Sequence, residues 1–268
     1  MLSSYEGKAV LVTGGTAGIG LATALAFASR GAQCTLTYRM GSADEDEVRA
    51  RFSAIGAPEP VIFQADASLD EDTDALLAKM AERHKSVEAL IINIPTALVT
   101  KTFADYDKRG LLKSIESSAW PLVEYTRRIK KVFGKYPRYV VGMSSTGVEQ
   151  FAAGYDFVAA SRGVMEILSR YMNYRLFDED CRINMLRSRS VRTAAFEQTF
   201  GAEFMKFAKR LTREEHFLQP EDVGWAAFAL CSGLMDGVSG QIITLDKGTT
   251  FFDNMSRLYN ERHALGLV

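Results

Sequence analysis

The chain has 268 residues, of which 47 % are hydrophobic and 24 % are charged, and 32 Lys and Arg residues nearly balance 33 Asp and Glu residues. A net charge of −1 gives no long-range field that would attract nucleic acid or an anionic membrane, and so high a hydrophobic fraction excludes a disordered chain. No run approaches the roughly 18 apolar residues of a membrane span, and no signal-peptide pattern precedes the first expected strand. Cys34, Cys181 and Cys231 are too far apart for a zinc site or a disulfide framework. We therefore expect a cytoplasmic protein without a metal, a nucleic-acid partner or a membrane partner.

Short β-branched segments alternate with longer amphipathic ones along the chain, a pattern that predicts βαβ units and a parallel sheet. The expected strands are residues 9–13, 34–38, 61–63, 89–92, 139–143, 183–186 and 240–245. The expected helices are residues 19–29, 45–55, 73–84, 111–133, 155–177 and one that begins at Pro220. Pro121 lies inside the fourth of these helices, where its missing amide hydrogen predicts a kink or a restart. The predicted fold class is α/β, with a doubly wound, seven-stranded parallel sheet in a single domain over residues 1–268.

Residues 188–219 interrupt this alternation. Large apolar side chains stand there among charged ones, at Phe196, Phe200, Phe204, Met205, Phe207 and Phe217. This mixture predicts one or two amphipathic helices, which we expect to form a small lid over an apolar substrate cavity. Apolar residues at helical spacing are also typical of ordinary core, so they do not identify the substrate.

A glycine-rich turn joins the first expected strand to the first expected helix, at residues 13–20 with the sequence Thr-Gly-Gly-Thr-Ala-Gly-Ile-Gly. In a Rossmann fold such a turn lets backbone N–H groups approach a pyrophosphate at the positive end of the helix. Gly14 allows the tight turn, Gly18 the close approach and Gly20 the contact between helix and sheet. Because the turn follows the first strand of an alternating α/β chain, it predicts a dinucleotide-binding site.

Arg39 follows the second expected strand, and no acidic residue stands at the tip of that strand. A Rossmann site for NAD usually places Asp or Glu there for the ribose 2′-hydroxyl, whereas Arg suits the 2′-phosphate of NADP. The acidic residues Asp44 to Glu47 lie close by and would oppose a phosphate, and a solvated strand end is the alternative role of Arg39. The pattern favours NADPH over NADH as the cofactor.

Three features of the chain occur together: the pattern Thr-Gly-x-x-x-Gly-x-Gly, seven strands in this order, and a serine-rich fifth strand before a long helix. With them, essentially the whole chain resembles the short-chain dehydrogenase/reductase superfamily. The resemblance implies that Asp66 and Ala67, after the third strand, hold the adenine ring. Residues 246–248, with the sequence Asp-Lys-Gly, match the Asp-Gly-Gly ending of that superfamily with one Gly replaced.

The expected helix at 155–177 corresponds to the active-site helix of the superfamily, but it lacks the common Tyr-x-x-x-Lys signature. Arg162 stands at the position of the Lys, and Val158, four residues earlier, has no proton to donate. Tyr155 lies seven residues before Arg162, which is similar to the Tyr-x6-Lys spacing of the enoyl-(acyl carrier protein) reductases within the superfamily. Seven residues are about two helical turns, so both side chains share one helix face, roughly 10 Å apart along the axis.

Further segments resemble these reductases, namely residues 93–95, 115–118, 143–147 and 191–193. The chain also departs from their pattern. Arg162 replaces the Lys, and Pro95 replaces a small residue. Ser188-Arg189 stands in place of a Pro-Gly or Ala-Gly pair, and Glu116 stands in place of the helix Asn of the proton relay. The chain therefore resembles a diverged member of a specialised biosynthetic pathway.

The resemblance implies a role for each candidate site residue. Tyr155 would donate its hydroxyl to the enolate oxygen of a reduced enoyl thioester, Arg162 would hold the nicotinamide ribose, and Ser145 would orient the substrate. The alternatives are a Tyr155 at the core edge, an Arg162 on a solvated helix face, and a Ser145 that only caps the next turn. The residues implied to contact the cofactor are Gly14, Thr16, Gly18, Ile19, Gly20, Arg39, Asp66, Ala67, Asn93, Arg162, Val191 and Thr193.

The leading hypothesis is an NADPH-dependent reductase that transfers hydride to the C=C bond of an enoyl (thio)ester in fatty-acid-like or secondary-metabolite biosynthesis. The first alternative is reduction of a ketone or conjugated enone on a small polyketide-like substrate, and the second is a silent or non-redox scaffold. The substrate would be a small molecule or an acyl group on a carrier. The resemblance also implies a homotetramer, or a homodimer, packed through the helices at 111–133 and 155–177.

Overall fold

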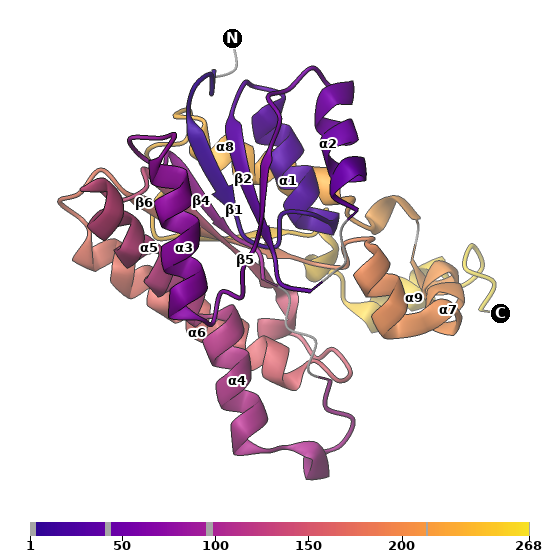
Figure 1. Ribbon diagram of the computed structural model, residues 1–268. Coiled ribbons are helices and arrows are strands. Elements are labelled where there is room, and N and C mark those ends of the chain that lie inside the picture. Colours follow the sequence, from indigo (N-terminus) through magenta and orange to yellow (C-terminus); the bar gives the residue numbers. More distant parts are fainter. Residues whose placement is uncertain (1–3, 41–43, 95–98, 213, 268) are drawn as a thin grey trace.

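The computed structural model describes residues 4–40, 44–94, 99–212 and 214–267. These residues form a seven-stranded parallel sheet in the order β3-β2-β1-β4-β5-β6-β7, so the direction of winding reverses between β1 and β4 (Figure 1). The predicted α/β class with a doubly wound sheet is confirmed. The strands are β1 (Ala9–Val12), β2 (Gln33–Tyr38), β3 (Val61–Gln64), β4 (Ala89–Ile92), β5 (Tyr139–Ser145), β6 (Arg182–Ser188) and β7 (Ile242–Leu245).

Helices cover both faces of the sheet (Figure 1). One hydrophobic core lies between the sheet and α1, α2 and α8, and a second lies between the sheet and α3, α5 and α6. The α-helices are α1 (Gly18–Ala28), α2 (Glu45–Ala54), α3 (Asp70–Ala81), α4 (Lys108–Ser118), α5 (Trp120–Phe133), α6 (Asp156–Arg175), α7 (Ala194–Leu211), α8 (Pro220–Cys231) and α9 (Asn254–Glu261). Short 3₁₀ turns are η1 (Phe103–Asp105), η2 (Thr146–Val148), η3 (Glu214–His216) and η4 (Thr249–Phe251).

The central strand β1 shows why both cores form. Val10 and Val12 pack in the core beneath α1 and α8, whereas Ala9 and Leu11 pack in the core beneath α3 and α5. Successive side chains of a strand point to opposite faces of the sheet, so a strand that is apolar at every position is buried on both sides. All four residues are buried.

The expected long helix at 111–133 is two helices, α4 and α5, which meet at Ala119. Pro121 stands in the first turn of α5, where its missing N–H leaves no intrahelical bond unmade, so the predicted restart is confirmed. The last strand begins at Ile242 and not at Gly240, because Gly240, with a φ of +72°, still belongs to the turn before it. Helix α9 was not predicted.

The described part of the segment predicted as a lid contains α7, in which two helical pieces meet at a kink. Its backbone leaves the helical conformation at Gly201, where φ is +76° and ψ is 168°, and η3 follows it. One or two helices were expected here, and the kink explains why the pattern fits either number. The lid function over residues 188–219 stays a prediction.

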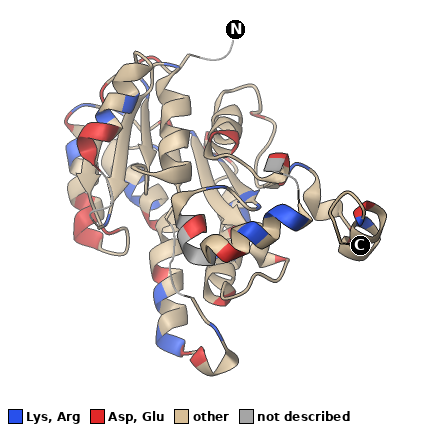
Figure 2. Cartoon of the chain, turned by 90° about the vertical axis from the view of Figure 1, so that its right-hand side faces the viewer, with Lys and Arg blue, Asp and Glu red and all other residues tan. Residues whose placement is uncertain are grey.

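Acidic and basic residues are interspersed along the helices (Figure 2). Within the described ranges, no helix is long and apolar enough to cross a membrane, and no group of three or more His, Cys, Asp or Glu side chains is arranged to hold a metal ion. An anionic ligand must therefore be held by individual groups, because the net charge of the chain contributes little attraction.

Candidate active site

The glycine-rich turn lies at the carboxyl edge of the sheet, between β1 and α1. Gly14 and Gly18 have φ angles of +59° and +51°, which residues with a Cβ rarely adopt. A Cβ on Gly20 would lie 2.0 Å from the carbonyl oxygen of Gly14, so the start of α1 packs directly on the turn. The N-cap residue Ala17 supplies no side-chain hydrogen bond to α1. The positive end of this helix is therefore left for an anionic group such as a phosphate.

Asn93, directly after β4, holds this turn in place. Its backbone N–H donates to Thr13 Oγ1 at 2.9 Å, and its Nδ2 donates to the carbonyl oxygen of Gly14 at 3.1 Å. A Cβ on Gly14 would lie only 2.4 Å from the Asn93 carbonyl oxygen, so the two segments are in close contact. Asn93 thus shapes the turn, a role that the sequence did not reveal, and its contact with a cofactor stays a prediction.

Arg39 and Asp66 follow the neighbouring strands β2 and β3, and their side chains meet at the carboxyl edge of the sheet. Arg39 Nη1 lies 3.6 Å from Asp66 Oδ2, and about half of the Arg39 side chain is exposed. Burial of Asp66 raises its pKa, but hydrogen bonds from the Ser68 N–H and hydroxyl and the charges of Arg39 and Lys113 hold that pKa below its ordinary value. Asp66 is therefore ionised beside Arg39. Ala67, the second residue assigned to the adenine ring, is partly buried next to it.

Tyr155 is the N-cap residue of α6, so the helix begins one residue later than expected. Its partly buried ring lies against η2, where a Cβ on Gly147 would come within 2.6 Å of Tyr155 Cδ1 and 2.8 Å of Cε1. Ser145 ends β5, and its Oγ accepts a hydrogen bond from the Gly147 N–H at 3.2 Å. The capping role left open for Ser145 is thus present. Its hydroxyl keeps a proton to donate, and its role in orienting substrate stays a prediction.

Arg162 is buried, with 7 % of its surface exposed, which contradicts the alternative of a solvated helix face. Its Nη2 donates to the carbonyl oxygen of Ile94 at 2.6 Å, whereas its Nη1 is buried without a hydrogen-bond partner in the part of the chain that the structure describes. Burial lowers the pKa of the guanidinium, and the nearby Tyr155 acts in the opposite direction. The two residues predicted to act together therefore lie close to each other.

Val191 and Thr193 lie after β6, beside the start of α7. Val191 is buried and pairs with Leu218 in an isolated bridge. Thr193 is the N-cap residue of α7 and accepts a hydrogen bond from the Phe196 N–H at 3.1 Å. A Cβ on Gly18 would lie 3.5 Å from the Thr193 methyl group, so this segment meets the glycine-rich turn. The Thr193 hydroxyl keeps its proton, so it can still donate a hydrogen bond to the carboxamide of a nicotinamide.

A buried polar cluster beneath the candidate site was missed by the sequence reasoning. Glu166 on α6 accepts hydrogen bonds from Ser144 Oγ at 2.5 Å and from Arg187 Nε and Nη2 at 3.0 and 2.6 Å. Arg187 on β6 also contacts Glu149 Oε1, just after η2, at 2.6 Å. Arg187 directly follows the strand expected at residues 183–186, and this was the available signal, because a charge that is buried in the sheet needs a partner.

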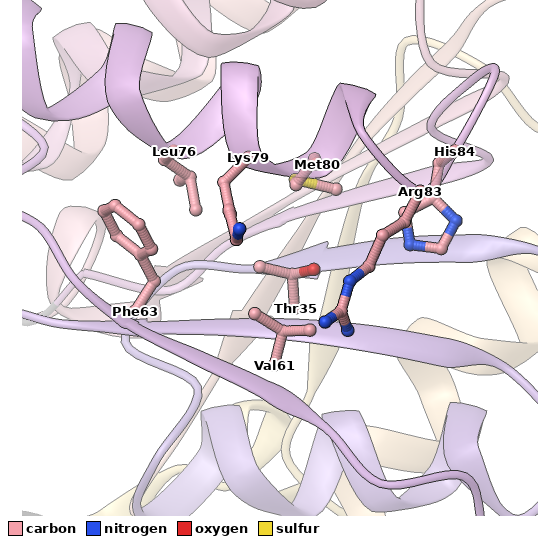
Figure 3. Close-up of a pocket in the computed structure, with 8 residues that line it drawn as sticks. All are labelled: Thr35, Val61, Phe63, Leu76, Lys79, Met80, Arg83 and His84. Atoms are coloured by element: carbon pink, nitrogen blue, oxygen red, sulfur yellow. The ribbon is translucent and has the colours of Figure 1, made fainter.

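A small hollow lies elsewhere, between α3 and the strands β2 and β3 (Figure 3). About 10 Å³ of it is accessible to a water molecule, which is room for roughly one water. It is therefore too small for a substrate. Its lining residues are Thr35, Val61, Phe63, Leu76, Lys79, Met80, Arg83 and His84.

The residues at the carboxyl edge fit a nicotinamide dinucleotide. A Cβ on Gly14 or Gly20 would strike the backbone of Asn93 or Gly14, so the turn takes this shape only with glycine at both positions. The start of α1 then offers its N–H groups to a pyrophosphate. Arg162 Nη1 is a buried donor without a partner among the described residues, and such a group calls for a polar ligand. The switch point between β1 and β4 is the place where doubly wound sheets bind ligands.

A doubly wound parallel sheet and a glycine-rich turn after β1 are features of a short-chain dehydrogenase/reductase. In this chain Tyr155 lies beside a buried Arg162, which stands where the superfamily has a Lys. A family model described as Enoyl-(Acyl carrier protein) reductase matches residues 14–250, and the chain belongs to this family. It is an NAD(P)H-dependent oxidoreductase.

Individual relatives cover nearly the whole chain. The enoyl-(acyl carrier protein) reductase (NADH) of Aquifex aeolicus is 27 % identical over 91 % of this chain and 91 % of its own. The NADP-dependent (R)-specific alcohol dehydrogenase of Lentilactobacillus kefiri is 29 % identical over 93 % of this chain and 99 % of its own. A solved 7 alpha-hydroxysteroid dehydrogenase, complexed with NADH and 7-oxo glycochenodeoxycholic acid, is 22 % identical with a TM-score of 0.81. It covers 91 % of this chain and 95 % of its own, and its likeness shows the fold.

Proposed function

We propose that this protein is an NADPH-dependent reductase of the C=C bond of an enoyl thioester, acting in fatty-acid-like or secondary-metabolite biosynthesis. The observation that carries this proposal is the pair of Tyr155 and the buried Arg162, seven residues apart and close together at the start of α6. This spacing resembles that of the enoyl reductases, and the relative from Aquifex aeolicus bears that activity in its name.

In this proposal the bound cofactor supplies the hydride for the β-carbon of the substrate. Tyr155 donates a hydrogen bond to the thioester carbonyl oxygen, on which negative charge develops as the enolate forms. Arg162 donates through Nη1 to the ribose hydroxyls and places a positive charge beside Tyr155. A guanidinium keeps its proton, so the proton for the α-carbon comes from Tyr155 or water and not through Arg162.

The preference for NADPH rests on Arg39. Its side chain is about half exposed at the end of β2, and its contact with Asp66 is longer than a hydrogen bond. The guanidinium therefore keeps donors for a 2′-phosphate, which would become its closer partner. The relative from Lentilactobacillus kefiri is NADP-dependent, whereas the one from Aquifex aeolicus uses NADH.

Reduction of a ketone or conjugated enone is the second candidate. The alcohol dehydrogenase of Lentilactobacillus kefiri is more identical to this chain than the enoyl reductase of Aquifex aeolicus, at 29 % against 27 %. Ser145, at the end of β5 near Tyr155, would then orient the ketone oxygen. The alternative of a silent scaffold is disfavoured, because the chain belongs to a family of oxidoreductases.

The test is NADPH oxidation with crotonyl thioesters of coenzyme A and of acyl carrier protein, beside a panel of ketones and enones. We expect turnover of a crotonyl thioester and a loss of about 100-fold in kcat in Tyr155→Phe, the usual effect of removing one oxyanion donor. Turnover of ketones alone would establish the second candidate. Equal turnover by wild type and Tyr155→Phe would refute the role of Tyr155.

We also propose that the chain forms a homotetramer or homodimer through α5 and α6. Ile167, Tyr171 and Tyr174 form an exposed apolar stripe on α6, since residues three and four apart share a helix face, and Trp120 of α5 is also exposed. A stripe of this kind is typical of an interaction surface. Light scattering should give a mass of two or four chains, and Tyr171→Glu should lower it.

A further inference from the structure

The Tyr155 ring packs closely against Gly147, and the roles assigned to the site residues above do not explain this contact. We infer that Gly147 in η2 is a positioning residue, whose missing side chain sets where the Tyr155 hydroxyl stands. This inference rests on the proposed role of Tyr155, and it concerns the geometry of that residue and not the identity of the substrate.

The contact itself is close and specific. A Cβ on Gly147 would lie 2.6 Å from Tyr155 Cδ1 and 2.8 Å from Cε1, whereas unbonded carbon atoms prefer about 3.5–4.0 Å. Gly147 does not have a positive φ, so its backbone conformation suits any residue. The third nearest atom is Ser145 Oγ at 3.5 Å, an ordinary contact distance, so among the described residues it is the Tyr155 ring that opposes a side chain there.

The η2 turn is held more firmly than the ring. Ser145 Oγ accepts from the Gly147 N–H, and the Thr146 carbonyl oxygen accepts from the N–H groups of Glu149 and Gln150 at 3.0 and 2.9 Å. Arg187 ties the end of the turn to the core, because it contacts both Glu149 and the buried Glu166.

Within the described ranges, the Tyr155 side chain makes no hydrogen bond or ion pair that would restrain it in this way. It precedes α6 as the N-cap residue and is partly exposed, and its backbone N–H and carbonyl group are bonded to Ala152 and Ala159. Rotation about its side-chain bonds costs little compared with displacement of a hydrogen-bonded turn. A methyl group at residue 147 should therefore displace the ring, by about 1 Å, the amount by which the contact falls short of a normal distance.

The chain offers a matched control in Gly163. It lies one residue after Arg162 inside α6, and a Cβ there would make only an ordinary contact, at 3.7 Å from Val148 Cγ1. Alanine is a better helix former than glycine, so Gly163→Ala should fold at least as well as wild type. It thus tests whether a methyl group near the site is harmful in itself.

The experiment compares Gly147→Ala, Gly163→Ala, Tyr155→Phe and the double variant Gly147→Ala/Tyr155→Phe, with NADPH and crotonyl-coenzyme A. A displacement of about 1 Å can cost on the order of 100-fold, so we expect Gly147→Ala to lower kcat by 10- to 100-fold. NADPH affinity should stay within about two-fold of wild type, since only the hydroxyl has moved. The double variant should be no slower than Tyr155→Phe, because the displaced group is already gone.

Crystal structures of the unliganded wild type and Gly147→Ala give a second measure that needs no turnover. A Tyr155 ring moved relative to Arg162, with η2 in place, supports the inference. An unmoved ring, or wild-type kcat in Gly147→Ala while Tyr155→Phe is slow, overturns it. Wild-type kcat in Tyr155→Phe would instead refute the proposed role of Tyr155 and leave the structural comparison valid.

If Gly147→Ala does not fold, the same change is made together with Tyr155→Ala. Recovery of the thermal transition to that of Tyr155→Ala alone would show that the ring was the obstacle. Failure of this double variant would show that Gly147 serves the turn and not Tyr155, and would overturn the inference.

Discussion

Arg162 Nη2 donates to the backbone carbonyl oxygen of Ile94, 68 residues earlier in the chain, at a distance of 2.6 Å. This bond ties the second turn of α6 to the segment after β4, and it leaves Nη1 buried without a partner among the described residues. A lysine donates all of its hydrogen bonds from one nitrogen, whereas the planar fork of arginine presents donors on separate nitrogens to partners on different sides. An arginine at this position can therefore hold the protein and a ribose together.

Replacing Arg162 by Met should separate cofactor binding from stability. We expect the free energy of unfolding of the unliganded protein to stay within about 1 kcal/mol of wild type or to increase, because a buried charge without a counter-ion is removed. NADPH affinity should fall about 10- to 100-fold with the loss of charged hydrogen bonds. Urea unfolding and fluorescence titration measure the two effects.

The control for this variant is Arg170→Met on the exposed side of the same helix. It should change NADPH affinity by less than two-fold, because an exposed arginine on this helix adds little to the local field. Unchanged NADPH affinity in Arg162→Met would rule out contact between Arg162 and the cofactor.

Replacing Arg39 by Ala should reverse or abolish cofactor preference. Loss of its charge-assisted bonds to a 2′-phosphate should raise the Kd of NADPH about 10- to 100-fold. The Kd of NADH should change little, because NADH has a hydroxyl at that place. Titrations with both cofactors decide the matter, and an equal loss for both would contradict the assignment of Arg39 to the phosphate.

The buried pair of Glu166 and Arg187 should matter for stability more than any exposed ion pair. Their side chains are 4 % and 8 % exposed, so Glu166→Gln leaves a buried charge with less compensation and should cost about 3 kcal/mol of unfolding free energy. Glu149→Gln is the control and should cost less than about 1 kcal/mol, because Glu149 is 65 % exposed. Urea unfolding measures both variants. Equal losses of unfolding free energy would contradict the view that the buried Glu166–Arg187 pair stabilises the fold more than an exposed ion pair does.

Stability should fall in alkaline solution through the buried thiols. Burial raises the pKa of Cys34 to about 12, whereas an unfolded thiol has a pKa of about 8.5. Between these values the unfolded chain loses the proton and the folded chain keeps it, so the stabilisation is complete below about pH 8.5 and is lost as pH rises toward 12. Cys34 alone should account for about 2 kcal/mol between pH 8 and pH 10.

Cys34→Ala tests this pH dependence independently of its own effect on packing. Its free energy of unfolding should decline less than that of wild type between the two pH values, by about 2 kcal/mol. Parallel declines for the two proteins would show that the Cys34 thiol loses its proton in the folded protein as well, and would contradict the raised pKa.

Whether the sequence predicted a feature of the site depends on how far apart in the chain the residues that form it lie. The turn at Gly14 to Gly20 was recognised because strand, turn and helix are consecutive, and its glycine conformations are local. Tyr155 and Arg162 are seven residues apart, and helix geometry alone predicts that their side chains share one face. The pairing of Arg39 with Asp66 required the neighbouring order of β2 and β3, which the sequence does not state.

The sequence by itself determined the class of fold and the type of cofactor site, because alternating apolar periods and a glycine pattern are encoded residue by residue. Only the tertiary structure decided that Arg162 is buried with its Nη1 unpartnered among the described residues, that Gly147 faces Tyr155, and that Arg187 is held by Glu166. These relationships join residues from different strands and helices. Burial and hydrogen bonding between them arise only when the sheet has formed and the helices pack against it.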